Sequence, residues 1–224
     1  MERFKTLMAD LLFPEGNACH LCGRGLDETG TLCERCLSGL RSCRYSPTTA
    51  ATSVRYKPLR VCISAYSHRD EARELVHRFK YDSDCAAAQV LGQDMAAVLL
   101  ACPAQPKRID AVVPVPLHAS RLEMRGYNQA LLLAQAVCAH SGLSLVPDAL
   151  VRLYDTGTQV PRDREARMQA MRSAFAVADS AQVRGRSILL VDDVLTTGAT
   201  AMSCAAALLD AGVRSVSLLT ACRA

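Results

Sequence analysis

The stretch Ser187-Ile-Leu-Leu-Val-Asp-Asp-Val-Leu-Thr-Thr-Gly-Ala-Thr200 decides the fold of this chain. Residues 187–191 are mostly apolar and rich in branched side chains, which predicts a buried β-strand. Asp192 and Asp193 follow this strand, and a turn then leads into a predicted helix at 199–211. A strand that runs through a short loop into a helix is typical of α/β sheets, which bind ligands where their strands end. We therefore expect a ligand site in this loop.

The loop carries residues that suit a ribose bearing a phosphate. These residues are Thr196, Thr197, Gly198, Ala199 and Thr200. The glycine allows a ligand to approach the backbone closely. The threonine hydroxyls and the free N–H groups of the first helical turn would converge on an anion, which the helix dipole also favours. Asp192 and Asp193 would each accept hydrogen bonds from vicinal sugar hydroxyls, so one segment predicts both a ribose clamp and a phosphate-binding turn.

Other interpretations fit only parts of this segment. The acid pair of a nucleotide hydrolase needs Gly-Lys in a phosphate-binding loop, and the chain contains no Gly-Lys dipeptide. The acid pair of a receiver domain is expected near the start of its domain rather than late in the sequence. The simplest alternative is a capped helix after a core strand, with both acids solvated, but that arrangement does not require two acids, three threonines and a glycine together.

Strand and helix signals alternate through the larger part of the chain. The hydrophobic pattern predicts strands at 61–66, 109–115, 187–191 and 216–221, and helices at 69–79, 86–100, 127–141 and 199–211. This alternation predicts an α/β fold with a Rossmann-like, mostly parallel sheet covered by helices. Before it come an amphipathic helix at 1–13, a Cys- and Gly-rich segment, and a stretch rich in Pro, Thr and Ser. We therefore expect an N-terminal helix and zinc-binding module at 1–45, a linker at 46–60 and the α/β domain at 61–224.

Two CxxC pairs in the N-terminal part predict a metal site. The cysteines are Cys19, Cys22, Cys33 and Cys36. Such pairs bend four thiolates toward one point, and four thiolates leave no open position on a tetrahedral Zn2+, so the site would be structural. Little apolar surface is available in this segment, and metal binding would supply the missing folding free energy. The alternative is four reduced cysteines in a loop.

The composition indicates a soluble globular protein. The 224 residues are 50% hydrophobic and 21% charged, and the net charge of +4 is too small to identify a nucleic-acid partner. No apolar stretch approaches the ~20 residues that cross a bilayer, and no leader-peptide pattern opens the sequence. The odd number of cysteines, 11, argues against a disulfide framework. We expect a cytoplasmic protein with no membrane span.

The order of these motifs resembles the ComF family (ComFC/GntX-like competence proteins), in which a short zinc module precedes a type I phosphoribosyltransferase domain. Residues 191–200 look like the phosphoribosyl pyrophosphate (PRPP) motif of that domain. The resemblance also covers Phe79-Lys80-Tyr81, Val113-Pro-Val-Pro-Leu-His118, Arg125-Gly-Tyr-Asn-Gln129 and the segment from Gln159 to Phe175. It implies a type I phosphoribosyltransferase fold that binds PRPP, and a role in DNA uptake during natural transformation or in a related pathway.

A loop after the strand at 109–115 suits the pyrophosphate group. It carries Arg121 and Arg125, and arginine binds phosphate oxygens in a bidentate manner. The resemblance implies that residues 117–121 hold the leaving group. The alternative for both arginines is a surface ion pair with Glu123 or with other acids. Three interpretations fit the basic segment from Arg162 to Arg172. It forms a hood that closes over the site, it binds a nucleic-acid backbone, or it is the solvated face of a helix. Lys80 suits either a phosphate or the negative end of its own helix.

Two functions remain open at this stage. The first is a transferase in which a nucleophile of unknown identity attacks the anomeric carbon of PRPP, with Mg2+ neutralising the departing pyrophosphate. Asp192 and Asp193 would hold the ribose in that reaction. The second is a non-catalytic protein that binds single-stranded DNA, or an adaptor for a DNA-uptake helicase or channel component, with the PRPP site used for regulation.

Overall fold

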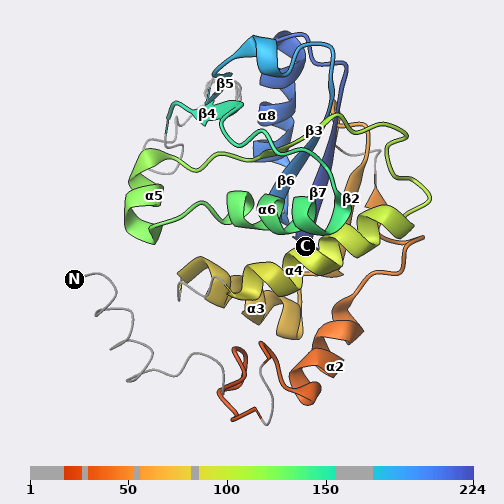
Figure 1. The fold of residues 1–224 in the computed structure, drawn as a ribbon, viewed down its shortest axis with the longest axis vertical. Coiled ribbons are helices and arrows are strands. Elements are labelled where there is room, and N and C mark those ends of the chain that lie inside the picture. The colour runs from red at the N-terminus through yellow and green to blue at the C-terminus, as the bar shows by residue number, and fades with distance from the viewer. Residues whose placement is uncertain (1–17, 27–29, 53–55, 82–85, 155–173) are drawn as a thin grey trace.

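The computed structural model describes residues 18–26, 30–52, 56–81, 86–154 and 174–224, and a five-stranded sheet forms its centre (Figure 1). The strands run in the order β1-β2-β7-β6-β3. Their bounds are β1 (Ala51–Thr52), β2 (Cys62–Ser67), β7 (Ser215–Arg223), β6 (Ser187–Leu195) and β3 (Ala111–Pro114). The last four are parallel, and β1 pairs antiparallel with β2 at one edge. The predicted α/β class with a mostly parallel sheet is therefore confirmed.

Helices cover both faces of this sheet. One face packs against α3 (Asp70–Tyr81), α4 (Ala86–Ala101) and α6 (Gln129–Ser141), and the other against α8 (Ala199–Asp210). A two-stranded sheet of β4 (Leu150–Arg152) and β5 (Phe175–Val177) and a 3-10 helix, η1 (Ser180–Gln182), flank the α8 face. Because both faces are covered, β7 is buried over nearly its whole length.

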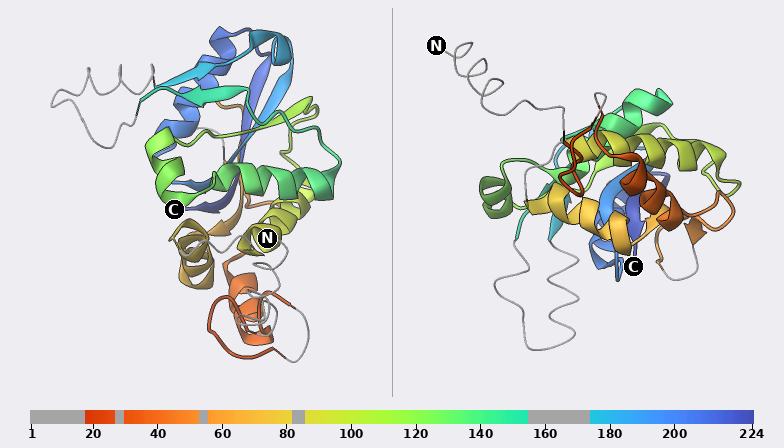
Figure 2. Two further views of the ribbon diagram at one scale, coloured as in Figure 1. Left: turned by 60° about the vertical axis from the view of Figure 1, so that its left-hand side comes forward. Right: turned by 90° about the horizontal axis from the view of Figure 1, so that it is seen from below.

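The N-terminal part adds helix α2 (Glu34–Cys43), which packs against α3. This end of the molecule lies opposite β4 and β5 in two views (Figures 1 and 2). The carboxyl group of Glu71 on α3 packs against Gly39, so it would have to move if position 39 carried a side chain. The guanidinium of Arg69 donates to the carbonyl of Ser42 at 3.1 Å. The cysteine-containing segment is therefore fixed to the α/β sheet through α3.

A polar cluster joins the end of α2 to the sheet and to α4. The side chain of Arg44 pairs with the carboxylate of Asp94, and the hydroxyl of Tyr66 donates to the same carboxylate. Tyr66 is fully buried, and burial and the neighbouring acid raise its pKa above the usual value. Arg44 also lies over the Tyr66 ring, with its guanidinium carbon 5.9 Å from the centroid. The Arg44 guanidinium thus balances the charge of the Asp94 carboxylate on α4.

The predicted strands and helices of the larger part are present, with one difference that matters for the site. Strand β6 continues past Val191 to Leu195, because the backbone of Asp192 and the residues after it still pair with β7. The acid pair therefore lies inside the strand rather than after it. The short elements α2, α5 (Ala119–Arg125), β1, β4 and β5 were not predicted. The expected helix at 1–13 and the Arg162 to Arg172 segment lie outside the described residues.

Candidate functional site

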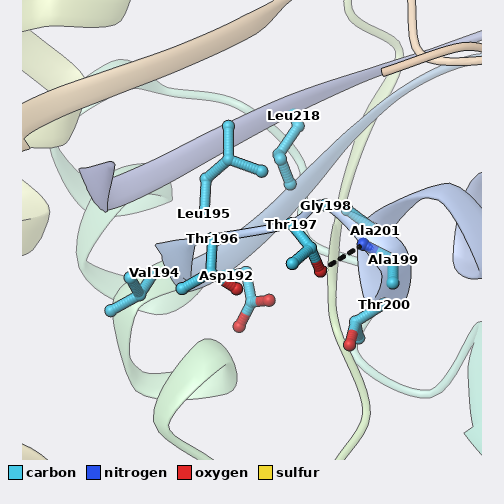
Figure 3. A pocket seen from close by; sticks show the side chains of 10 residues that line it. All are labelled: Asp192, Val194, Leu195, Thr196, Thr197, Gly198, Ala199, Thr200, Ala201 and Leu218. Carbon is cyan, nitrogen blue, oxygen red and sulfur yellow. Dashed lines mark hydrogen bonds between the residues drawn. The ribbon is translucent and has the colours of Figure 1, made fainter. Parts of the chain in front are cut away.

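A small pocket lies where β6 passes into α8 (Figure 3). Its lining comes from the end of β6, the following loop, the start of α8 and one residue of β7: Asp192, Val194, Leu195, Thr196, Thr197, Gly198, Ala199, Thr200, Ala201 and Leu218. The structure therefore brings the first of the two acids together with all five loop residues that the sequence selected. The carboxylate of Asp192 and the hydroxyls of Thr197 and Thr200 lie on one side of the loop (Figure 3).

The backbone of the loop turns sharply at Gly198. Its φ of 76° lies in the left-handed region, where a side chain is strained, and it forms the N-cap of α8. The backbone N–H of Ala199 donates to the Thr197 hydroxyl at 3.4 Å. The first backbone N–H groups of a helix have no partner within the helix, so this turn presents hydrogen-bond donors and the positive end of the α8 dipole to the pocket. This chemistry suits a phosphate group.

Tyr56 contacts this turn at Gly198 and at Thr196. A Cβ atom at position 198 would lie 2.4 Å from the Tyr56 ring, and the tyrosine hydroxyl donates to the carbonyl of Thr196 at 3.4 Å. Only 5% of Tyr56 is exposed. The sequence gives no indication that Tyr56 belongs to the site, because its contact with the loop spans 140 residues of sequence.

The two acids have different surroundings because successive residues of a strand point to opposite faces of the sheet. Asp192 lines the pocket, whereas the carboxylate of Asp193 pairs with the ammonium of Lys80 at 3.1 Å. The backbone N–H of Asp193 donates to the Asp192 carboxylate at 2.9 Å. Burial and the neighbouring negative charge of Asp193 raise the pKa of Asp192 to about 7. The pocket therefore contains a carboxyl group that titrates near neutral pH.

The two predicted pyrophosphate arginines lie on α5, which begins after β3. Within the described part of the chain, neither lines the pocket around the threonine loop. The guanidinium of Arg125 donates to the side-chain oxygen of Gln129 at 3.1 Å and lies over the ring of Tyr81, with 5.3 Å between its carbon and the centroid. Arg121 is half-buried on the first turn of the same helix. Their role in binding pyrophosphate stays a prediction.

The four predicted metal-binding cysteines converge on one point. The sulfur atoms of Cys19, Cys22, Cys33 and Cys36 all lie within 4.8 Å of one another. In the first knuckle the Gly23 N–H donates to the Cys19 carbonyl at 2.8 Å, and Gly23 has a φ of 70° that suits glycine. In the second, Cys33 precedes α2 and Cys36 lies in its first turn. Two independent local structures therefore present two thiols each.

The spacing of these sulfur atoms fits a tetrahedral metal. The Cys22 and Cys33 sulfurs are 3.7 Å apart. A zinc ion with bonds of ~2.3 Å to four thiolates separates neighbouring sulfurs by about 3.8 Å. Cys19 and Cys36 are buried, Cys33 is half-buried and Cys22 is exposed, so the group lies at the surface of the module. The donor set and its spacing suit structural Zn2+.

Comparisons with known proteins point to one group of relatives. The chain is similar to the DNA utilization protein YhgH of Salmonella typhimurium, with 30% identity over 210 residues that cover 92% of this chain and 89% of the relative. It is also similar to the competence protein ComFC of Bacillus subtilis, with 30% identity over 221 residues that cover 95% and 87% of the two chains. No family model matches the chain.

Among solved structures, a similar one is the glutamine PRPP amidotransferase from Bacillus subtilis in complex with ADP and GMP. The TM-score is 0.42 and the identity is 19%, over 60% of this chain and 26% of that chain. None of the helices that the structure describes combines the length and the apolar character that crossing a membrane requires.

Proposed function

Because the chain belongs to the ComF family of competence and DNA utilization proteins, we propose that it binds PRPP at the end of β6, in a cellular process that takes up or uses DNA. The observation that supports this most is the joint lining of one pocket by Asp192 and the loop from Thr196 to Thr200. The 5′-phosphate would bind the threonine hydroxyls and the N–H groups that open α8. The carboxylates of Asp192 and Asp193 would accept hydrogen bonds from the ribose hydroxyls.

The pyrophosphate group would extend from the ribose toward α5. Arg121 and Arg125 are the cations proposed for it, since a guanidinium binds phosphate oxygens through paired N–H donors. Mg2+ bound together with PRPP would neutralise part of the pyrophosphate charge. The four cysteines would hold a structural Zn2+ that stabilises the N-terminal segment against α3.

Calorimetric titration with PRPP and Mg2+ tests this proposal. Wild-type protein should bind, and Asp193→Ala and Thr197→Val should each weaken binding at least about tenfold, since each removes a hydrogen bond to a charged or polar ligand group. Asp210→Asn is the matched control, because Asp210 is exposed at the far end of α8. Wild-type affinity for PRPP in both Asp193→Ala and Thr197→Val would reject the site.

Two further assays separate a transferase from a non-catalytic binding protein. Release of pyrophosphate from bound PRPP in the presence of candidate nucleophiles would identify an enzyme, whereas binding without turnover favours a regulatory site. Binding of single-stranded DNA that weakens steeply with added salt would support the DNA-binding alternative. Repeating that assay with PRPP present would show whether the two ligands influence each other.

A further inference from the structure

The ion pair between Lys80 and Asp193 connects helix α3 to the acid pair of the proposed ribose clamp. Lys80 is the penultimate residue of α3, and its ammonium nitrogen lies 3.1 Å from the Asp193 carboxylate. Both side chains are largely buried, with 23% and 13% exposed. We propose that Lys80 is a positioning residue of this site: its ammonium orients Asp193 and supplies the positive charge that two adjacent carboxylates need to bind ribose as acceptors. This inference rests on the proposed function.

The end of α3 is held in place independently of this ion pair. Phe79 is fully buried, and its backbone carbonyl accepts a hydrogen bond from the hydroxyl of Tyr127. The two rings also contact each other, with centroids 5.9 Å apart. Tyr127 follows α5, the helix that carries the proposed pyrophosphate arginines. The backbone at Lys80 is therefore fixed by these contacts. Because its side chain is also largely buried, the ammonium loses little conformational freedom when it pairs with the Asp193 carboxylate.

Lys80 acts within a defined set of charges. On the Asp192 side, Arg152 of β4 also carries a positive charge, and the buried thiol of Cys204 on α8 is close enough to interact electrostatically. Near Asp193, the titratable neighbours are His68, before α3, and the thiol of Cys222 on β7. Arg73 of α3 adds positive charge near His68. Lys80 forms the ion pair with Asp193, and Arg152 also lowers the pKa of Asp192.

These charges predict a pH signature that a purely structural lysine would not give. Lys80 and Arg152 both lower the pKa of Asp192, against the larger effects of burial and of Asp193. Without Lys80 the pKa of Asp192 should therefore rise above its present value of about 7. A protonated carboxyl group is a weaker acceptor for a sugar hydroxyl. As the pH is lowered, the variant without Lys80 should therefore lose PRPP affinity at a higher pH than the wild type does.

The test compares the variants Lys80→Met, which keeps an unbranched apolar side chain without the charge, and Lys80→Arg, which keeps the charge. PRPP affinity is measured from pH 6 to 9 with Mg2+. We expect Lys80→Met to bind about tenfold more weakly at pH 7, to recover at pH 9, and to shift the midpoint upward by about one pH unit. Lys80→Arg should restore most of the affinity. The ionisation of PRPP itself is common to all variants and cancels in the comparison.

A double-mutant cycle checks that Lys80 acts through its partner. In an Asp193→Asn background, Lys80→Met should change PRPP affinity less than it does in the wild type, because its ion-pair partner is gone and only its direct effect on Asp192 remains. Repeating the pH series with His68→Asn excludes the histidine as the titrating group. Wild-type pH dependence in Lys80→Met, or a loss equal at all pH values that Lys80→Arg does not reverse, would overturn the proposal.

A second measurement does not depend on PRPP. Carbon-13 NMR of the aspartate carboxyl groups in the ligand-free protein follows the titration of Asp192 directly. We expect its midpoint to move upward in Lys80→Met and to return in Lys80→Arg. If the wild type fails to bind PRPP while this shift is seen, the proposed function is wrong and the coupling of Lys80 to the acid pair is retained. If PRPP binds and the midpoint does not move, the role of Lys80 is wrong.

Discussion

The aromatic ring of Tyr56 occupies the space that a side chain at Gly198 would need, with 2.4 Å between a Cβ built there and the ring. The two residues come from distant parts of the chain, and the tyrosine hydroxyl also contacts the loop at the Thr196 carbonyl. Tyr56 therefore packs against the proposed phosphate-binding turn, and we expect the shape of the turn to depend on both residues.

Removing the Tyr56 ring should weaken PRPP binding. Tyr56→Ala leaves a cavity beneath the turn, and the backbone donors of the loop lose their fixed positions. We expect an affinity about tenfold lower by calorimetry, and a free energy of unfolding about 3 kcal/mol lower from the lost packing. Tyr56→Phe keeps the ring and should bind within about threefold of wild type, because the hydroxyl contact is long at 3.4 Å. Equal losses in both variants would contradict a role for the ring.

Gly198→Ala should lower PRPP affinity more than Tyr56→Ala does. Alanine is strained at a φ of 76°, at a cost of about 1–2 kcal/mol, and its methyl group would also displace Tyr56. The double variant Gly198→Ala/Tyr56→Ala removes the collision but keeps the backbone strain. We therefore expect the double variant to lose less stability than the sum of the two single losses when unfolding is followed by urea denaturation. Additive losses would mean that the collision is unimportant.

Asp192→Asn should stabilise the ligand-free protein at alkaline pH while removing PRPP binding. The pKa of Asp192 is raised to about 7 in the folded protein, so its contribution to stability is present at acid pH and is lost as pH rises through about 7. Asparagine has no charge to bury. We expect an advantage of about 1–3 kcal/mol at pH 8 that disappears near pH 4, measured by thermal unfolding across pH. A constant difference at all pH values would contradict the ionisation argument.

Cys36→Ser should remove the metal from the N-terminal segment. Mass spectrometry of the wild type is expected to find one zinc per chain, and the variant should contain almost none, because the remaining three thiols cannot complete the tetrahedral site. Protease cleavage within residues 18–43 should become faster. Cys138→Ser is the matched control, since Cys138 is half-buried on α6 and outside the four-cysteine group. Full zinc content in Cys36→Ser would reject the assigned ligand set.

Arg44→Ala should loosen the attachment of α2 to the sheet. Its loss leaves the Asp94 carboxylate, which is 17% exposed, with the Tyr66 hydroxyl but without its cation. We expect a free energy of unfolding about 1–3 kcal/mol lower in urea, with zinc still bound. Arg41→Ala, at an exposed position in the last turn of α2, should change stability by less than about 0.5 kcal/mol. Similar effects in both variants would show that the Asp94 contact contributes little.

The sequence predicted those parts of the site that are local in the chain. The four cysteines and the loop from Thr196 to Thr200 are each contained in a short segment, and their spacing determines which atoms meet. The alternation of strands and helices predicted the sheet for the same reason, because apolar periodicity depends on neighbouring residues. The extension of β6 through Asp192 was missed because polar side chains end the apolar run, although backbone pairing with β7 continues.

The contacts that support the site could not be predicted, because they join distant segments. Tyr56 was assigned to a linker by its Pro-, Thr- and Ser-rich surroundings, and nothing in that pattern indicates that its ring reaches Gly198. Lys80 was recognised as a cation at the end of a helix, which is equally consistent with a favourable interaction with the helix dipole. Its partner became evident only when the packing of α3 on the sheet was known.

The position of β7 has a consequence for how this protein is made. β7 lies between β2, which ends at Ser67, and β6, which ends at Leu195, and it forms backbone hydrogen bonds with both. During translation both strands would wait with exposed edges until residues 215–223 leave the ribosome, and exposed edges invite aggregation. Fragments that stop before residue 215 leave β2 and β6 without their shared partner strand, and we expect them to be insoluble.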